Sequence, residues 1–137
     1  MDATLEEAVA AYVRNFGDEP EHMVFAPGRV NFIGEHVDYN DGWVLPFALP
    51  FRTYVVGSLV KNGSKKSTVI SCSLGQDNLA MFEINSSLAK GQPAWANYVK
   101  GTIFQYLAEL PPGFAFNATI ASSVPMGSGL SSSASLE

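Results

Sequence analysis

The sequence has little cysteine: Cys72 is the single thiol among 137 residues. It cannot form a disulfide within the chain, which fits a reducing compartment, and we expect a buried structural thiol because no basic residue adjoins it. No apolar run approaches the ~18 residues that a membrane-spanning helix requires. The first ten residues, MDATLEEAVA, lack the basic and apolar regions of a signal peptide. We therefore expect a cytoplasmic protein without a membrane partner.

Basic residues are also few, eight against thirteen acidic ones, and the formal net charge is −5. A protein that binds duplex nucleic acid needs a basic stripe, so this class of partner is not expected. A small anion can still bind, because a local site can be positive on an acidic protein. His36 and Asp38 could be two metal ligands, but no further histidine or cysteine cluster completes such a site. We expect His22, the other histidine, in an exposed loop.

The hydrophobic pattern predicts an α+β fold in one domain. Apolar residues from Leu5 to Phe16 recur at helical spacing, and Gly17 ends that helix. Residues 22–50 mix short apolar runs with proline and glycine, which predicts a strand, a loop and a strand. Further strands are predicted at residues 52–60, 67–72, 79–85 and 114–121, and a helix at residues 94–110, stopped by Pro111-Pro112-Gly113. Helices and strands do not alternate strictly, so the class is α+β rather than α/β.

The stretch PMGSGLSSSASLE, residues 125–137, predicts a phosphate-binding turn that opens into a helix near Leu130 or Ser131. The free N–H groups and the dipole of a helix start favour an anion. Gly127 and Gly129 have no Cβ, so the backbone can approach a phosphate closely. Three serines supply hydroxyls for phosphate or Mg²⁺, whereas a helix cap, the alternative, needs only one. The stretch is neither a P-loop nor a dinucleotide fingerprint, since it lacks the lysine and the third glycine.

The stretch APGRVNFIGEHVDYNDGWVLP, residues 26–46, concentrates polar side chains on a predicted loop. Carboxylates accept hydrogen bonds from sugar hydroxyls, imidazole can donate or accept, and arginine is a permanent donor. If residues 35–38 are extended, His36 and Asp38 face one way and Glu35 the other. The alternative for Arg29 is a surface ion pair worth at most ~1 kcal/mol. We favour recognition of hydroxyl groups.

These stretches resemble known kinases. GRVNFIGEHVDYNDGWVLP resembles the galactokinase signature, and PMGSGLSSSAS resembles the ATP-phosphate motif of the galactokinase, homoserine kinase, mevalonate kinase and phosphomevalonate kinase superfamily. WANYVKG, residues 95–101, is similar to a stretch that galactokinases carry between the two. The resemblance runs from Phe16 to Glu137. It implies ATP-dependent phosphorylation of D-galactose to galactose 1-phosphate, with ATP and Mg²⁺, on the superfamily's N-terminal domain, a mixed sheet packed on helices.

The resemblance also assigns roles to single residues. Arg29 matches the arginine that supports the transferring phosphoryl group, and Ser133 matches the Mg²⁺ ligand. Phe32 stands where leucine is usual, a conservative change. Val37 stands where threonine is usual and removes a hydroxyl, and N-acetylgalactosamine kinases often vary at this position, so such a kinase is an alternative. The sugar-binding positions are Glu35, His36 and Asp38; the ATP-binding positions are Gly127, Ser128, Gly129, Leu130, Ser131, Ser132 and Ser133, with Trp95 and Tyr98 near the adenine.

Some parts of the family pattern have no counterpart here. They are the catalytic aspartate of a later GIMDQ-like motif, the glutamate that shares Mg²⁺, and the C-terminal domain. We therefore expect residues 1–137 to be a partial N-terminal kinase domain, a fragment of a longer protein, with a sugar-binding segment at 26–46 and a phosphate loop at 125–135. Alone it should be inactive and poorly soluble, because an incomplete fold exposes apolar surface.

Two other classes of function stay open at this point. A truncated form could hold ATP or galactose as a non-catalytic sensor. A hydrolase could use Ser131, His36 and Asp38 as nucleophile, base and orienting group. The hydrolase is the weaker alternative, since the sequence has no G-x-S-x-G elbow.

Overall fold

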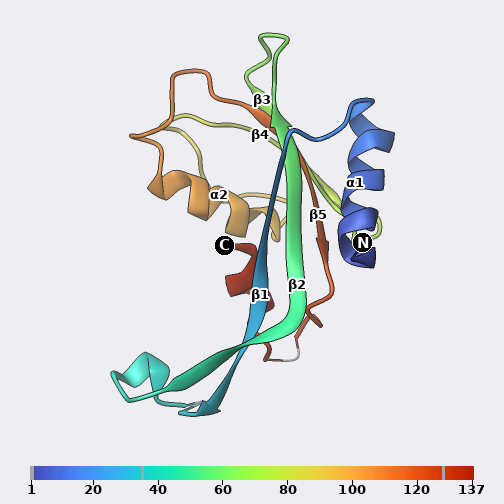
Figure 1. The fold of residues 1–137 in the computed structure, drawn as a ribbon. Helices are drawn as coiled ribbons and strands as arrows, with labels where there is room; N and C mark the ends of the chain where they lie inside the picture. The colour runs from blue at the N-terminus through green and yellow to red at the C-terminus, as the bar shows by residue number, and fades with distance from the viewer. Residues whose placement is uncertain (1, 35, 128) are drawn as a thin grey trace.

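The computed structural model describes residues 2–34, 36–127 and 129–137, and for Asp38 the backbone alone (Figure 1). The predictions for Glu35 and Ser128 therefore lie outside the described residues. In chain order the elements are α1 (Ala3–Phe16), β1 (His22–Ile33), the 3-10 helix η1 (Asp38–Asn40), β2 (Leu45–Leu59), β3 (Lys66–Ser71), β4 (Leu79–Glu83), α2 (Ala96–Gln105), β5 (Phe116–Ser122) and α3 (Ser132–Leu136).

In the described part of the chain, five strands form one mixed sheet in the order β1-β2-β5-β3-β4. The pairs β1–β2, β2–β5 and β3–β4 are antiparallel, whereas β3 and β5 run parallel. Helix α1 covers one face of the sheet, and α2 and α3 lie on the other (Figure 1). The predicted α+β class, a mixed sheet packed on helices, is confirmed.

Helix α1 packs on β2 and β5 through small and aromatic side chains. Asp2 caps its first turn by accepting a hydrogen bond from the Thr4 N–H at 2.9 Å, and Gly17, with φ 86°, ends it as predicted. The Thr119 hydroxyl donates to the Ala8 carbonyl at 2.7 Å and ties the helix to the sheet. Together α1 and this face of the sheet form the first hydrophobic core, whose buried residues are Ala8, Tyr12, Tyr54, Val56 and Ala121.

The opposite face holds the second core. Ala96 of α2 is buried there, and Leu136 of α3 packs against the same cluster. Its buried sheet residues are Val69, Ala80, Phe82, Ala118 and Ile120. Helix α2 ends at Gln105, so the predicted end at Leu110 is wrong. The N–H groups of Tyr106 and Leu107 bond to carbonyls three residues back, which tightens the chain into turns well before the prolines.

Strand β2 is continuous where the sequence predicted two separate strands. β2 begins at Leu45 and includes Pro46 and Pro50. The strand tolerates both prolines because in this part it pairs with β1 alone, and its pairing with β5 begins only at Thr53. A missing N–H is tolerated on the unpaired side of a strand. Arg29 lies within β1 rather than in a loop, and His22, although exposed, is the first residue of that strand.

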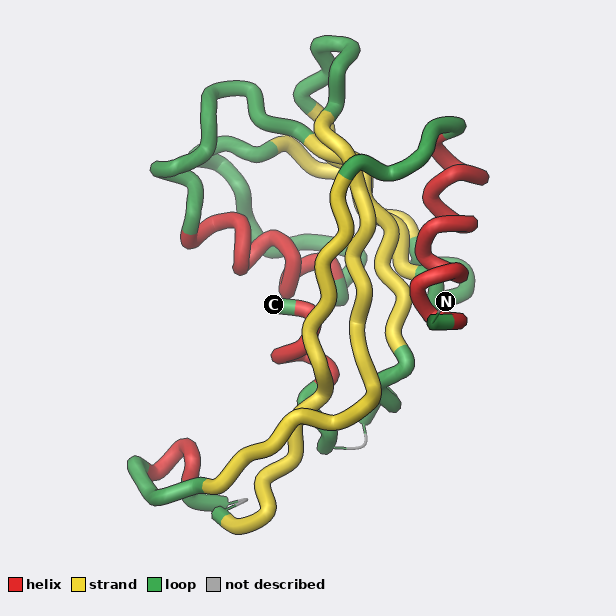
Figure 2. Tube along the Cα trace, in the orientation of Figure 1, coloured by secondary structure: helices red, strands yellow, loops and turns green. Residues whose placement is uncertain are grey.

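The distal part of the β1–β2 hairpin and its turn, residues 30–47, extends away from the rest of the molecule (Figure 2). We call these residues the arm. Phe32 is 77% exposed and Trp43 is 97% exposed. Ile33, Tyr39, Leu45 and Phe47 are also exposed. The arm therefore presents apolar side chains to solvent on a hairpin that carries the predicted sugar-binding residues at its tip.

Candidate functional site

The glycine-serine loop, residues 123–131, connects β5 to α3. Gly127 and Gly129 have φ values of 70° and 75°, in the left-handed region that glycine adopts readily. No described atom lies within 4 Å of the position a Cβ would take at either residue. The two glycines thus turn the backbone sharply and leave its outer side open. This agrees with the physical reason for predicting a phosphate loop, while the phosphate itself stays a prediction.

Helix α3 begins at Ser132, one residue later than predicted, and has five residues. So short a helix is not stable without packing. Ser131 precedes it with φ 62°, and no cap hydrogen bond from its side chain is found among the described residues. The helix-cap alternative therefore gains no support at Ser131, and the exposed side of the loop and the hydroxyls of Ser132 and Ser133 are the groups that can donate to an anion.

The glycine-serine loop is bonded directly to β1 at Arg29. The Arg29 N–H donates to the Leu130 carbonyl at 3.1 Å, and the Ser131 hydroxyl donates to the Arg29 carbonyl at 3.3 Å. Gly28 permits this approach, because a Cβ there would lie 3.0 Å from the Leu130 oxygen. The two motifs are about a hundred residues apart in sequence, yet they are in direct contact. A shallow cavity of about 360 Å³ lies at this junction, lined by Arg29, Phe47, Ser131 and Ala134 among others.

The tip of the arm is folded more tightly than predicted. The Val37 N–H donates to the Gly34 carbonyl at 3.1 Å, and the Gly42 N–H donates to the Val37 carbonyl at 2.8 Å. Residues 36 and 37 lie in a turn and Asp38 begins η1, so the condition of an extended segment is not met there, and the alternation that depended on it does not apply. His36 is exposed, and its Nδ1 lies 3.4 Å from the Tyr39 hydroxyl oxygen.

These contacts do not support the hydrolase alternative. The Ser131 hydroxyl is bonded to the Arg29 carbonyl, and His36 has its ring nitrogen near Tyr39. Within residues 2–34, 36–127 and 129–137, no hydrogen bond joins Ser131 to a histidine. A nucleophile and its general base need such a bond.

The two predicted adenine residues lie beside the serine run. Trp95 and Tyr98 line an apolar cavity of about 200 Å³ together with Ser132 and Ser133. The Trp95 ring is held by a hydrogen bond from its Nε1–H to the Asp77 carbonyl at 2.6 Å. The structure therefore brings an aromatic pair and two serines of the predicted phosphate motif to one cavity.

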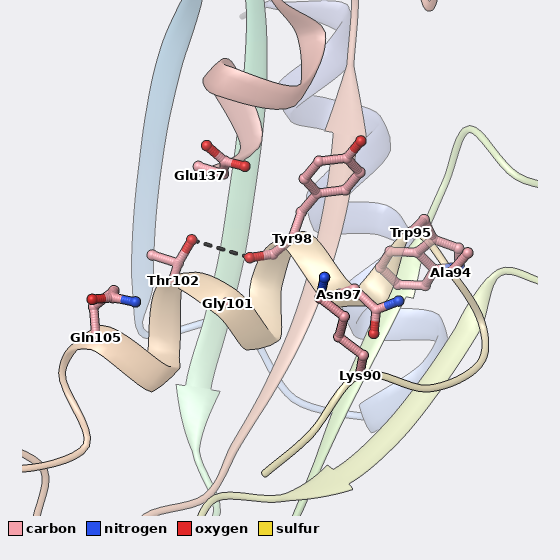
Figure 3. Close-up of a pocket in the computed structure, with 9 residues that line it drawn as sticks. All are labelled: Lys90, Ala94, Trp95, Asn97, Tyr98, Gly101, Thr102, Gln105 and Glu137. Carbon is pink, nitrogen blue, oxygen red and sulfur yellow. Dashed lines mark hydrogen bonds between the residues drawn. The ribbon is translucent and has the colours of Figure 1, made fainter.

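A second, open cavity of about 690 Å³ lies along α2, reaches Glu137 after α3, and shares Trp95 and Tyr98 with the first (Figure 3). Thr102 donates to the Tyr98 carbonyl at 3.1 Å across one helical turn. Lys90, Asn97 and Glu137 add polar groups to its rim. An apolar aromatic wall beside polar groups is the usual make-up of a small-molecule site.

Metal ligation and the thiol were also predicted. Among the described residues, no group of three histidine, cysteine or acidic side chains could hold a metal ion. Ser133 is exposed and can offer one hydroxyl oxygen.

Cys72 is half-buried rather than fully buried, and its burial raises the pKa of the thiol. No described helix is long and apolar enough to cross a bilayer.

Sequence reasoning missed two residues that shape the site. Gly28 stands inside the stretch at residues 26–46, but nothing in the sequence shows that the Leu130 carbonyl lies against it. Thr53 lines the smaller cavity and comes from β2, outside both motifs in the sequence. A strand residue of this kind carries no signal of its own.

Comparisons with known proteins agree with the two motifs. The galactokinase galactose-binding signature matches residues 10–59, and the N-terminal domain of GHMP kinases matches residues 97–137. The chain is 51% identical over 136 residues to a protein named galactokinase from Homo sapiens, covering 97% of this chain and 34% of that protein. It is 42% identical over 135 residues to a galactokinase of Haemophilus influenzae, with the same coverage. The chain thus spans about a third of the length of these relatives.

Two solved structures resemble this fold. The galactokinase of Lactococcus lactis, solved in complex with galactose, matches with a TM-score of 0.80 and 34% identity over 94% of this chain and 33% of that one. The mevalonate kinase of Methanococcus jannaschii matches with a TM-score of 0.64 and 18% identity over 84% of this chain and 36% of that one. The second likeness concerns the fold alone.

Proposed function

Because this chain corresponds to the N-terminal portion of the galactokinases, within the GHMP superfamily, we propose that it supplies the sugar-binding and phosphate-binding parts of an enzyme that phosphorylates D-galactose with ATP. One observation carries the proposal: the glycine-serine loop is hydrogen-bonded to β1 at Arg29. The backbone of Arg29 makes this contact, and Arg29 and Ser131 line one cavity, so the permanent cation of the Arg29 side chain can act on a phosphate held there. Phosphoryl transfer depends chiefly on such positioning and on neutralising charge.

In this proposal Arg29 stabilises the charge of the transferring phosphoryl group, and the arm holds the sugar. The exposed imidazole of His36 can donate to or accept from a sugar hydroxyl, and the carboxylates of Glu35 and Asp38 can accept from one. The L. lactis relative, described as complexed with galactose, supports galactose as the sugar.

ATP is proposed to lie between α2 and the glycine-serine loop. Its phosphates would meet Gly127 to Ser133, and its adenine would lie against Trp95 and Tyr98. The chemistry fits, because an aromatic wall can stack with a planar base while hydroxyls and backbone N–H groups bind phosphate oxygens. Mg²⁺ prefers oxygen ligands and often takes few from protein, so the Ser133 hydroxyl with the phosphates can hold it. When bound, Mg²⁺ neutralises the charge that develops on the phosphates.

The nucleotide site can be tested with the two tryptophans of the sequence. Trp43 is 97% exposed on the arm, whereas Trp95 lines the cavities. In a Trp43→Phe background the emission comes from Trp95, and we expect ATP to change it saturably. The matched control, Trp95→Phe with Trp43 retained, should show no saturable change. A flat titration of the Trp95 emission up to about 1 mM ATP, a typical upper KM, would contradict the nucleotide site.

The sugar site can be tested with the two histidines. His36→Ala should weaken galactose binding measured by calorimetry, because it removes a hydrogen-bonding group at the tip of the arm. His22→Ala, at the opposite end of β1, is the matched control and should bind like the original chain. Titration with N-acetylgalactosamine in parallel decides between the two sugars. Equal affinities of the two histidine variants would argue against the arm as the sugar site.

We further propose that the 137-residue chain alone does not turn over galactose, since it has no counterpart of the family's catalytic aspartate. Galactose 1-phosphate formation from ATP and galactose should stay at the level of the Arg29→Ala and Ser133→Ala variants. Turnover clearly above both variants would contradict this proposal. Binding of both ligands without turnover is the expected result.

A further inference from the structure

A line of hydroxyl groups crosses the base of the glycine-serine loop. The Thr53 Oγ1 of β2 lies 2.8 Å from the Ser122 Oγ of β5 and 2.8 Å from the Ser135 Oγ of α3. The Ser135 hydroxyl also reaches the Ser132 carbonyl at 2.9 Å, and the Val124 N–H reaches the Ser122 Oγ at 3.2 Å. Thr53 is 3% exposed and Ser135 is 6% exposed. The line is therefore shielded from water at its centre.

The direction of every hydrogen bond in this line follows from counting protons. A hydroxyl has one proton to donate. Ser135 gives its proton to the Ser132 carbonyl, which can only accept, so Thr53 must donate to Ser135. Thr53 then has no proton left for Ser122, so Ser122 must donate to Thr53, while it accepts from the Val124 N–H. The bonds thus run one way from Val124 to Ser132, and bonds aligned in this way polarise one another.

The two ends of this line are the two ends of the glycine-serine loop. Val124 is the second residue after β5, and Ser132 is the first residue of α3. Glycines in the left-handed region and a five-residue helix supply few internal interactions that would hold the loop and α3 in one conformation. We propose that Thr53 is a positioning residue for the glycine-serine loop: its hydroxyl is the central link that joins the start of the loop to its end. The part of this inference that concerns ATP rests on the proposed function.

A variant at position 53 can separate the hydroxyl from the shape of the side chain. Thr53→Val keeps the volume but removes the link, and leaves the Ser122 proton and a Ser135 lone pair without this partner. Thr53→Ser keeps the link. The matched control is Thr119→Val, a threonine that is also buried and that bonds to α1 on the other face of the sheet. Ser135→Ala breaks the same line at its helix end.

The experiment measures hydrogen exchange of the full 137-residue chain by mass spectrometry, followed by the dissociation constants for ATP and galactose. In Thr53→Val we expect the amides of residues 124–136 to exchange roughly three- to tenfold faster, the loss of about one net hydrogen bond. The sheet amides should stay protected. ATP binding should weaken by a similar factor and galactose binding should not change. Thr53→Ser should stay within about twofold of the original chain in both measurements, and Thr119→Val should leave residues 124–136 unaffected.

Each other outcome overturns the inference. The inference fails if Thr53→Val leaves hydrogen exchange at residues 124–136 unchanged. It also fails if Thr119→Val speeds exchange at these residues, or if Thr53→Ser speeds it as much as Thr53→Val does. If Thr53→Val unfolds, Ser135→Ala decides by the same criteria. If the original chain binds no ATP, the proposed function fails, but the exchange measurement still decides whether Thr53 positions the loop.

Discussion

Gly28 lies against the glycine-serine loop, where a side chain would meet it. A Cβ at this position would lie 3.0 Å from the Leu130 oxygen and 3.3 Å from a Val124 methyl. These contacts are tight, so Gly28→Ala must push the loop away from β1 or strain the strand. We expect the free energy of unfolding, measured with urea, to fall by roughly 1–3 kcal/mol, as for other overpacked sites.

The control for Gly28 is Gly75→Ala, where no described atom lies within 4 Å of the new Cβ. It should change the free energy of unfolding little or raise it. If Gly28→Ala is as stable as Gly75→Ala, the glycine-serine loop moves away from the new Cβ at little cost, and its contact with β1 at Arg29 contributes little to stability.

At the residue scale, the sequence allowed the site to be predicted in pieces. Arg29 and the serine run were both identifiable from their local patterns. Their union could not be predicted, because most of it is made by backbone groups: the Arg29 N–H, the Leu130 carbonyl and the Arg29 carbonyl. Every residue has a backbone carbonyl and every residue except proline has a backbone N–H, so side-chain identity does not show which of these groups will pair.

Among the elements, α1 has an acid-sensitive start. The Asp2 carboxylate accepts hydrogen bonds from the Thr4 N–H and the Tyr54 hydroxyl, and these lower the pKa of Asp2 below its ordinary value. A lowered folded pKa means that the carboxylate stabilises the fold above its unfolded pKa, near 4, and that this contribution is lost as the pH falls through the lower folded value.

Asp2→Ala should therefore lower Tm at pH 7, and its difference from the original chain should shrink as the pH falls below about 4. Asp2→Asn keeps a capping oxygen without the charge, so its Tm should depend less on pH than the Tm of the original chain. Thermal melts from pH 7 to pH 2 measure both. A difference between Asp2→Ala and the original chain that stays constant with pH would show that the carboxylate's charge does not contribute.

Helix α2 contains a glycine that its packing does not require. Gly101 lies in the interior of Ala96–Gln105 and is exposed. Outside the helix's own backbone, no described atom lies within 4 Å of the position that a Cβ would take there. Alanine loses less backbone freedom on folding, so Gly101→Ala should raise the free energy of unfolding by ~0.5–1 kcal/mol. Urea denaturation measures this, and a fall in stability would mean that the site needs the glycine for a reason other than helix packing.

The elements were predicted well where the pattern was local. The helix at α1 carried apolar spacing and a terminal glycine, and its end at Gly17 was found, whereas its start at Ala3 lies two residues before the first apolar residue of the pattern, Leu5. The end of α2 was missed because the turns at Tyr106 and Leu107 follow from hydrogen bonds to carbonyls three residues back, not from a breaker residue. β2 was divided in the prediction because its prolines suggested a loop, whereas pairing on one side alone makes them tolerable.

For the whole molecule, the arm is a surface on which exposed large apolar side chains gather. Phe32 and Trp43 are exposed by 77% and 97%. The isolated chain should therefore bind the dye ANS and self-associate in sedimentation experiments. Phe32→Ser with Trp43→Ser should reduce both effects without lowering Tm, because neither side chain is part of the two cores.

A control pair for the arm is Met81→Ser with Leu79→Ser, exposed apolar residues of β4 at the far edge of the sheet. If these substitutions reduce dye binding as much as those in the arm, the apolar surface is spread over the molecule rather than gathered on the arm.

The position of β5 in the sheet has a consequence for how the chain is made. β5 pairs with β2 on one side and β3 on the other, yet it is the last of these strands to be synthesised. Until residues 116–122 leave the ribosome, the growing polypeptide carries two hairpins with open edges and an α1 without its Thr119 anchor. Open edges are templates for wrong pairing. The interval between the exit of β4 and the exit of β5 from the ribosome is thus the one in which a nascent chain most needs a chaperone, and slow codons that lengthen this interval should lower the yield.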